Sequence, residues 1–168
     1  MADEPAPSFK QQVQDAAAQS SWAELLSGAE TMRDGWAEVI DGLSADDSPN
    51  GPQDGPWSPW HLLNHVGAWL EGATNALDRA TQGESTDLGS DQAFYGDSPS
   101  FEEARDRVAR YVDTFVAQIE ACGAGVGDDV RVTHRLLGEI NTAEYAVLAT
   151  GHVNGHTAQM REMRGLGD

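Results

Sequence analysis

Four stretches of the chain repeat apolar side chains at the spacing of an α-helix, and this pattern limits the fold more than any other feature. They run from Ser20 or Ser21 to Leu43, from Ser58 onward, from about Phe101 to Cys122, and from Asn141 to about Arg164. In each stretch the apolar residues recur every three or four positions, which places them on one side of a helix. Four amphipathic helices without credible strands predict an all-α four-helix bundle.

The ends of these helices carry recognisable start and stop signals. Ser58 followed by Pro59 is typical of an N-cap and a first helical position. Asn141 and Glu144 have the spacing of a capping box, with asparagine at its head. Gly165 is suited to end the last helix, because glycine adopts the left-handed conformation found there.

The rest of the chain predicts little regular structure. Residues 1–8 read as a flexible acidic tail, and 8–19 as a weak helix at best. The stretch "VRVTH" at 130–134 could be extended, but we expect it to be too short to support a sheet. With 168 residues, 39% of them hydrophobic, the chain can bury one sizeable core, so residues 9–168 are predicted to form a single domain.

The charge balance restricts the partners. The formal net charge is −18, from 28 acidic and 10 basic residues, and such a surface repels nucleic-acid phosphates and anionic lipids. No apolar run approaches the roughly 18 residues that span a bilayer. The first residues lack the basic-then-apolar order of a secretory signal, and the single cysteine, Cys122, excludes an internal disulfide. These features predict a cytoplasmic protein with neither nucleic-acid nor membrane partners.

His152 and His156 lie four residues apart in the middle of the apolar stripe of the last helix. An imidazole buried there needs a partner, because an unpaired polar group is costly to bury. The pattern leaves two readings open, namely core histidines satisfied by backbone or water, or two ligands of a metal ion. Gly151 and Gly155 flank the stripe and would let a neighbouring backbone approach closely.

A metal site requires a third ligand from another segment. His65 lies at the edge of the apolar arc of the second helix, whereas His61 leans toward solvent and His134 is expected on the surface or in a loop. Three neutral imidazoles can bind zinc with Zn–N distances of about 2.0–2.1 Å, and they also suit nickel, copper and iron. Three protein ligands leave a position open for a reacting molecule.

The motifs "WSPWHLLNHVGAWL" and "TAEYAVLATGHVNGHTAQM" resemble the DinB/YfiT-like superfamily. The matching positions are Trp57, Ser58, His65, His152, His156 and Gln159. The resemblance implies a four-helix bundle in a minor variant of the up-and-down topology, often a homodimer, with zinc or nickel held by the three histidines. Similar proteins include transferases and isomerases that use mycothiol, bacillithiol or glutathione, and a few metal-dependent hydrolases. This sequence departs from the family at Gly155, where relatives often carry a bulky or histidine residue.

The leading functional hypothesis is therefore a metal-dependent thiol S-transferase that acts on a small-molecule substrate with a low-molecular-weight thiol as cosubstrate. Tyr145 and Gln159 flank the ligands and could orient them, and Phe94 and Tyr95 could shape the mouth of the site. A metal-dependent hydrolase is an alternative, although no acidic residue stands on the ligand stripes to act as its base. The third hypothesis is a non-catalytic, stress-related bundle that binds a metal or ligand. Cys122 is not favoured as a nucleophile, because no cation near in sequence would stabilise its thiolate.

Overall fold

The computed structural model describes residues 7–49, 51, 57–88 and 97–167. Most of the predicted acidic tail lies outside the described residues, as do Phe94 and Tyr95, the two residues predicted to shape the mouth of the site.

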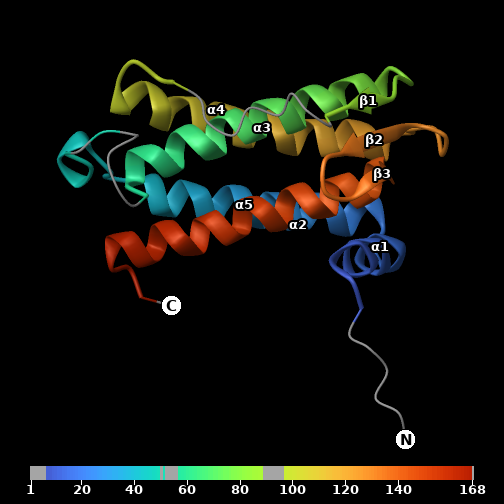
Figure 1. Ribbon diagram of the computed structural model, residues 1–168, viewed down its shortest axis with the longest axis horizontal. Helices are drawn as coiled ribbons and strands as arrows, with labels where there is room; N and C mark the ends of the chain where they lie inside the picture. Colours follow the sequence, from blue (N-terminus) through green and yellow to red (C-terminus); the bar gives the residue numbers. More distant parts are fainter. Residues whose placement is uncertain (1–6, 50, 52–56, 89–96, 168) are drawn as a thin grey trace, which may run out of the picture.

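Four long helices form the body of the protein, which confirms the predicted all-α bundle (Figure 1). They are α2 (Trp22–Ile40), α3 (Pro59–Thr81), α4 (Phe101–Gly123) and α5 (Thr142–Arg164). Helix α2 packs against α4 and α5, and α3 also packs against α4 and α5. The order around the bundle is therefore α2, α4, α3, α5, with the consecutive helices α2 and α3 on one diagonal and α4 and α5 on the other. This departs from a plain up-and-down bundle, and it brings α3 beside α5.

The caps read from the sequence are present. Ser58 accepts a hydrogen bond from the His61 backbone N–H at 3.2 Å, and Pro59 follows it as the first residue of α3. The Asn141 side chain accepts from the Glu144 N–H at 2.8 Å, and the Glu144 carboxylate accepts from the Asn141 N–H at 2.9 Å. These bonds satisfy donors that a helix start would otherwise leave unpaired. At the far end of α5, Gly165 adopts a φ of 64°.

Replacing Asn141 with alanine is expected to lower the free energy of unfolding by about 1 kcal/mol, because the capping bond to Glu144 is lost. Asn154→Ala is the matched control, since Asn154 is an exposed residue in the interior of the same helix, where alanine is the better helix former. Chemical denaturation of both variants measures the difference. Equal stability of the two variants would show that the cap does not contribute.

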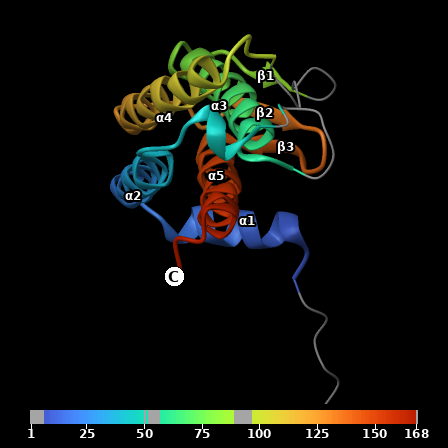
Figure 2. The same cartoon turned by 90° about the vertical axis from the view of Figure 1, so that its left-hand side faces the viewer.

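Two segments are more ordered than predicted. Residues 8–19 hold an eleven-residue helix, α1 (Phe9–Gln19), where a weak helix at best was expected. Helix α1 crosses α5 on the outside of the bundle (Figure 2). Its Lys10 ammonium donates to the Leu137 carbonyl at 2.7 Å, so tertiary contacts supplement the weak local propensity.

The expectation that 130–134 is too short to support a sheet was wrong. The strands are β1 (Thr86–Asp87), β2 (Arg131–His134) and β3 (Gly138–Asn141), with β2 parallel to β1 and antiparallel to β3. Val132 faces Ile140 across the β2–β3 pair, and both side chains are buried against the bundle. Such a sheet depends on packing against the helices, which the pattern of its own residues does not reveal.

The core is contiguous and apolar. Its largest fully buried side chains come from all four bundle helices, from the turn after α2 and from β3: Trp36, Tyr145, Phe101, Phe115, Met32, Leu43, Leu62, Leu63, Leu70, Leu77, Ile119 and Ile140. Among the described residues, every helix is too short or too polar to cross a lipid bilayer.

Candidate metal centre

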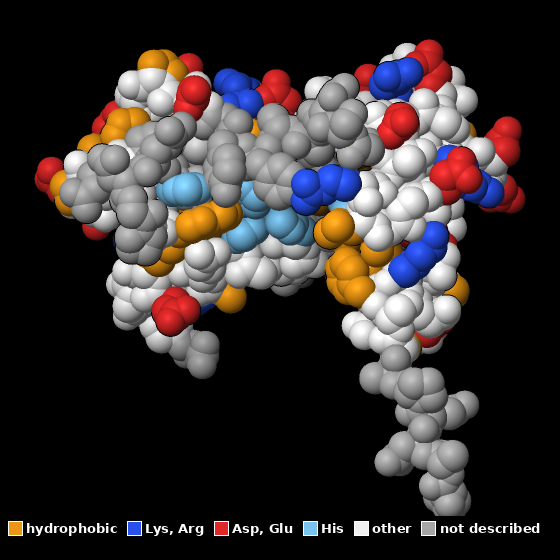
Figure 3. Space-filling view, in the orientation of Figure 1, with side chains coloured by type: hydrophobic (Ala, Val, Ile, Leu, Met, Phe, Trp, Pro, Cys, Tyr) orange, Lys and Arg blue, Asp and Glu red, His pale blue; other side chains and the backbone are white. Residues whose placement is uncertain are grey.

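His65, His152 and His156 converge between α3 and α5. One ring nitrogen from each lies within 4.8 Å of those of the other two, and the Nε2 atoms of His65 and His152 are 3.2 Å apart. Two nitrogens bound at about 2.05 Å to one tetrahedral ion lie about 3.3 Å apart, so this spacing fits shared coordination. His65 is 3% exposed, deeper than its predicted place at the edge of the apolar arc, and the other two are half-buried. In the space-filling view the histidine side chains gather in one band on this face (Figure 3).

The local electrostatics keep the rings of His152 and His156 neutral at neutral pH. Burial, the largest cause, acts together with the neighbouring His156, His65 and His134 to lower the pKa of His152 to about 3. Burial also lowers the pKa of His156, against the opposing effect of its hydrogen bond to Gln159. A neutral imidazole has a nitrogen lone pair to offer, whereas a protonated one cannot bind a metal. His152 and His156 therefore offer nitrogen lone pairs that could bind a cation at neutral pH.

Gln159 fixes the tautomer of one ring. Its Oε1 lies 2.9 Å from Nδ1 of His156, and because an amide oxygen only accepts, Nδ1 carries the proton. The Nε2 atom of the neutral ring then holds the lone pair. Partners of this kind orient metal-binding histidines in many sites.

Two indoles pack against the three imidazoles. The Trp57 ring stacks on His156 at a centroid distance of 5.7 Å and meets His65 edge-on at 4.9 Å. The Trp69 ring stacks on His152 at 4.4 Å. The candidate ligands thus sit in a frame of aromatic rings that restricts their rotation.

The remaining sequence-predicted residues lie as follows. His61 was predicted to lean toward solvent. It is half-buried, and its ring stacks on Trp57 at a centroid distance of 4.5 Å. Tyr145 is fully buried behind Trp69, with its ring 6.4 Å from that of Trp69.

The prediction of His134 on the surface or in a loop was wrong, because His134 ends β2 and is only 9% exposed. Along β2 alternate residues point inward, and His134 takes the inward position after Val132.

The expected close approach of a backbone to Gly151 and Gly155 is not observed. A Cβ atom on either glycine would meet no heavy atom within 4 Å among the described residues. Gly151 and Gly155 are exposed, and they keep this part of the α5 surface low beside the two histidines.

Sequence reasoning did not identify the aromatic frame, although a signal was present. Trp57, His61, His65 and Trp69 follow one another at intervals of four residues, "W-x3-H-x3-H-x3-W". That interval stacks side chains along one face of a helix. Together with His152 and His156, this four-residue spacing indicates contacts between the tryptophan rings and the three histidines.

Cys122 has no part in this site. It is fully buried, its thiol lies 3.8 Å from the Leu77 carbonyl, and burial raises its pKa to about 11. A thiol with such a pKa is not ionised at neutral pH, so it is a poor nucleophile.

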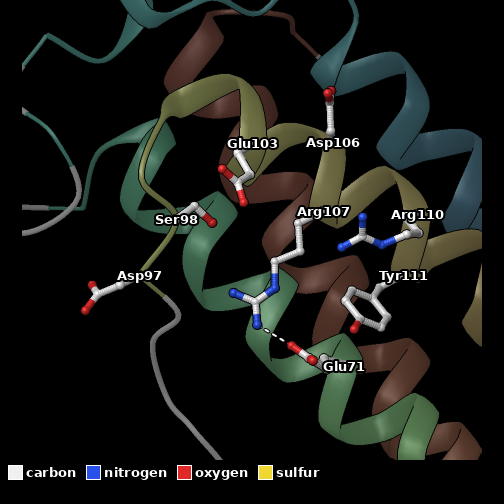
Figure 4. Close-up of a pocket in the computed structure, with 8 residues that line it drawn as sticks. All are labelled: Glu71, Asp97, Ser98, Glu103, Asp106, Arg107, Arg110 and Tyr111. Atoms are coloured by element: carbon white, nitrogen blue, oxygen red, sulfur yellow. Dashed lines mark hydrogen bonds and ion pairs between the residues drawn. The ribbon is translucent and has the colours of Figure 1, made fainter.

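A cavity of about 480 Å³ lies away from the three histidines, on the side of α3 turned to α4 (Figure 4). Its lining is polar: Glu71, Asp97, Ser98, Glu103, Asp106, Arg107, Arg110 and Tyr111. Arg107 forms an ion pair with Glu71, and this hydrogen bond is the largest cause that holds the pKa of Glu71 below its usual value. Among the described residues, the group suited to hold a metal is the three histidines and not this lining.

The depressed pKa of His152 predicts a pH dependence of the metal-free protein. As the pH falls from about 6.5 toward 3, the unfolded chain binds a proton at His152 that the folded protein does not, so stability falls with pH in this window. The variant His152→Ala removes this contribution, and its stability should fall less steeply. Denaturation between pH 6.5 and 4 measures how the free energy of unfolding changes with pH in each protein. The two slopes should differ by the equivalent of up to about one bound proton. Parallel slopes would contradict the assigned environment of His152.

The model of the DinB superfamily matches residues 29–160, which include all three histidines. No curated protein and no solved structure matches the chain.

Proposed function

This chain belongs to the DinB superfamily, and we propose that it binds one divalent cation, zinc or nickel, through His65, His152 and His156. The observation that carries the proposal is the convergence of the three ring nitrogens within 4.8 Å. The 3.2 Å spacing of two of them and the depressed pKa of His152 and of His156 support it.

We further propose that the protein is a thiol S-transferase whose cosubstrate is a low-molecular-weight thiol of the mycothiol, bacillithiol or glutathione type. A divalent metal held here would ionise a bound thiol, because a coordinating thiol loses its proton. The three histidines are neutral ligands, so they leave the positive charge of the ion uncompensated and favour an anionic thiolate. The buried Cys122 cannot supply the sulfur, so a separate thiol is required. The sulfur would form a bond to the carbon of an electrophile, whose leaving group departs with the electron pair.

The hydrolase alternative receives less support. Hydrolysis at such a site calls for a carboxylate base near the open position. Among the described residues, the group that could hold a metal consists of imidazoles alone. Homodimer formation and a cytoplasmic location stay predictions, and size-exclusion chromatography with light scattering would test the first.

The test of the transferase proposal is a conjugation assay with zinc- or nickel-loaded protein. Each of the three thiols is supplied with 1-chloro-2,4-dinitrobenzene, and release of chloride and formation of the thioether are measured. We expect conjugation above the uncatalysed rate with at least one thiol, and its loss in His65→Ala, His152→Ala and His156→Ala. Activity unchanged in all three variants would refute a metal-dependent transferase.

A further inference from the structure

We propose that Trp57 is a positioning residue of the metal centre, which fixes the planes of the His156 and His65 rings by direct aromatic contact. This role rests on the proposed metal site. It assigns a function to a tryptophan that directly precedes the N-cap of α3.

The contacts of Trp57 are directed at the ligands. Its ring is nearly parallel to that of His156, at an interplanar angle of 12° and a centroid distance of 5.7 Å, and meets His65 at 66° and 4.9 Å. Both distances fall in the range of about 4.5–7 Å over which aromatic pairs attract. One indole therefore contacts a ligand from α5 and a ligand from α3.

The indole is itself held in place. His61 stacks on it at 4.5 Å and 18°, so Trp57 is nearly parallel to two imidazoles. The next residue, Ser58, caps α3 by accepting from the His61 N–H and also donates to the Gly51 carbonyl at 3.1 Å. The N-cap thus anchors the backbone beside Trp57, and the stacked His61 restrains its ring.

This restraint complements the one made by Gln159. The hydrogen bond from His156 Nδ1 to Gln159 fixes one atom of the ring, and rotation about that bond remains open. The stacked Trp57 indole fixes the plane, so the two contacts together direct Nε2 of His156. Outer partners that orient ligands in this way alter metal affinity by about 10–100-fold.

Trp57 suits a test because it is half-buried, whereas Trp69 is 6% exposed and belongs to the core. The variants are Trp57→Phe, which keeps an aromatic ring, and Trp57→Leu, which keeps apolar bulk without one. Trp60→Leu is the matched control, because Trp60 is also half-buried and packs edge-on against Phe101 at 6.0 Å. Zinc affinity is measured by competition with a chromophoric chelator, the visible spectrum of the cobalt-loaded protein reports the ligand geometry, and thermal unfolding without metal checks the fold.

We expect Trp57→Leu to bind zinc about 10–100-fold more weakly than the parent protein and to show an altered cobalt spectrum. Trp57→Phe should retain most of the affinity, and Trp60→Leu should match the parent in both measurements. Parent-like affinity and spectrum in a folded Trp57→Leu protein would overturn the positioning role, as would equal losses in Trp57→Leu and Trp60→Leu. Failure of the parent protein to bind zinc, nickel or cobalt at all would instead overturn the metal site on which the role rests.

Discussion

Replacing His152 with alanine is expected to weaken zinc or nickel binding by more than about 100-fold, which exceeds the usual cost of changing an outer partner of a ligand. His152 supplies one of three converging nitrogens, 3.2 Å from that of His65. Its loss leaves a two-histidine site. Titration of metal-free protein against a competing chelator measures the affinity.

His134→Asn is the control for this variant. His134 lies outside the three-ligand group, and its Nδ1 accepts from the Leu136 N–H at 3.2 Å, a bond that an asparagine oxygen can replace. The control should bind metal like the parent protein. If His152→Ala binds metal as tightly as this control, the three-histidine site is incorrect.

Replacing Phe115 with alanine is expected to lower the free energy of unfolding by about 3–5 kcal/mol, because a fully buried aromatic side chain of α4 leaves a cavity. The matched control is Phe9→Ala on α1, where the side chain is 56% exposed, and we expect a change within about 0.5 kcal/mol. Urea denaturation of the metal-free proteins measures both values without a contribution from ligand binding.

A loss of less than about 1 kcal/mol in Phe115→Ala would mean that α4 is less tightly packed than described. A loss at Phe9 equal to that at Phe115 would instead place α1 within the main core. Either result would change the account of how the bundle supports the site.

The bundle was predictable from sequence because its signals are local. The Asn141–Glu144 box and the Ser58–Pro59 start act within four residues, and the structure has both. The sheet was missed because its strands contain only two to four residues, and because β1 pairs with a segment far along the chain, Thr86 lying opposite Val132. His134 was misplaced for the same reason, since its inward direction follows from strand alternation.

The ligand group was predictable in part. The angular position of each histidine on its own helix favoured His65 over His61, and the family resemblance agreed. What the angles could not provide was the diagonal arrangement that brings α3 beside α5. The contacts of Trp57 with the histidines were not predicted, although its four-residue interval to His61 is present in the sequence. Trp57 precedes α3, so helical angles alone do not fix the direction of its ring.

Placement of the site follows from this topology. Helices α3 and α5 are neighbours in the bundle. In contrast, α2 lies diagonally opposite α3, and α4 lies diagonally opposite α5. Two histidines 87 residues apart, His65 and His152, can therefore meet within hydrogen-bond distance. The rigid helices on both sides keep the ligand spacing constant, as a metal site requires.

The most direct test of the three-histidine site is the X-ray absorption spectrum of the protein loaded with one equivalent of zinc. We expect about three imidazole nitrogens at about 2.0–2.1 Å and one further light atom in the open position. A spectrum with fewer than two imidazoles, or with zinc bound mainly by carboxylate oxygens of the acidic surface, would contradict the site.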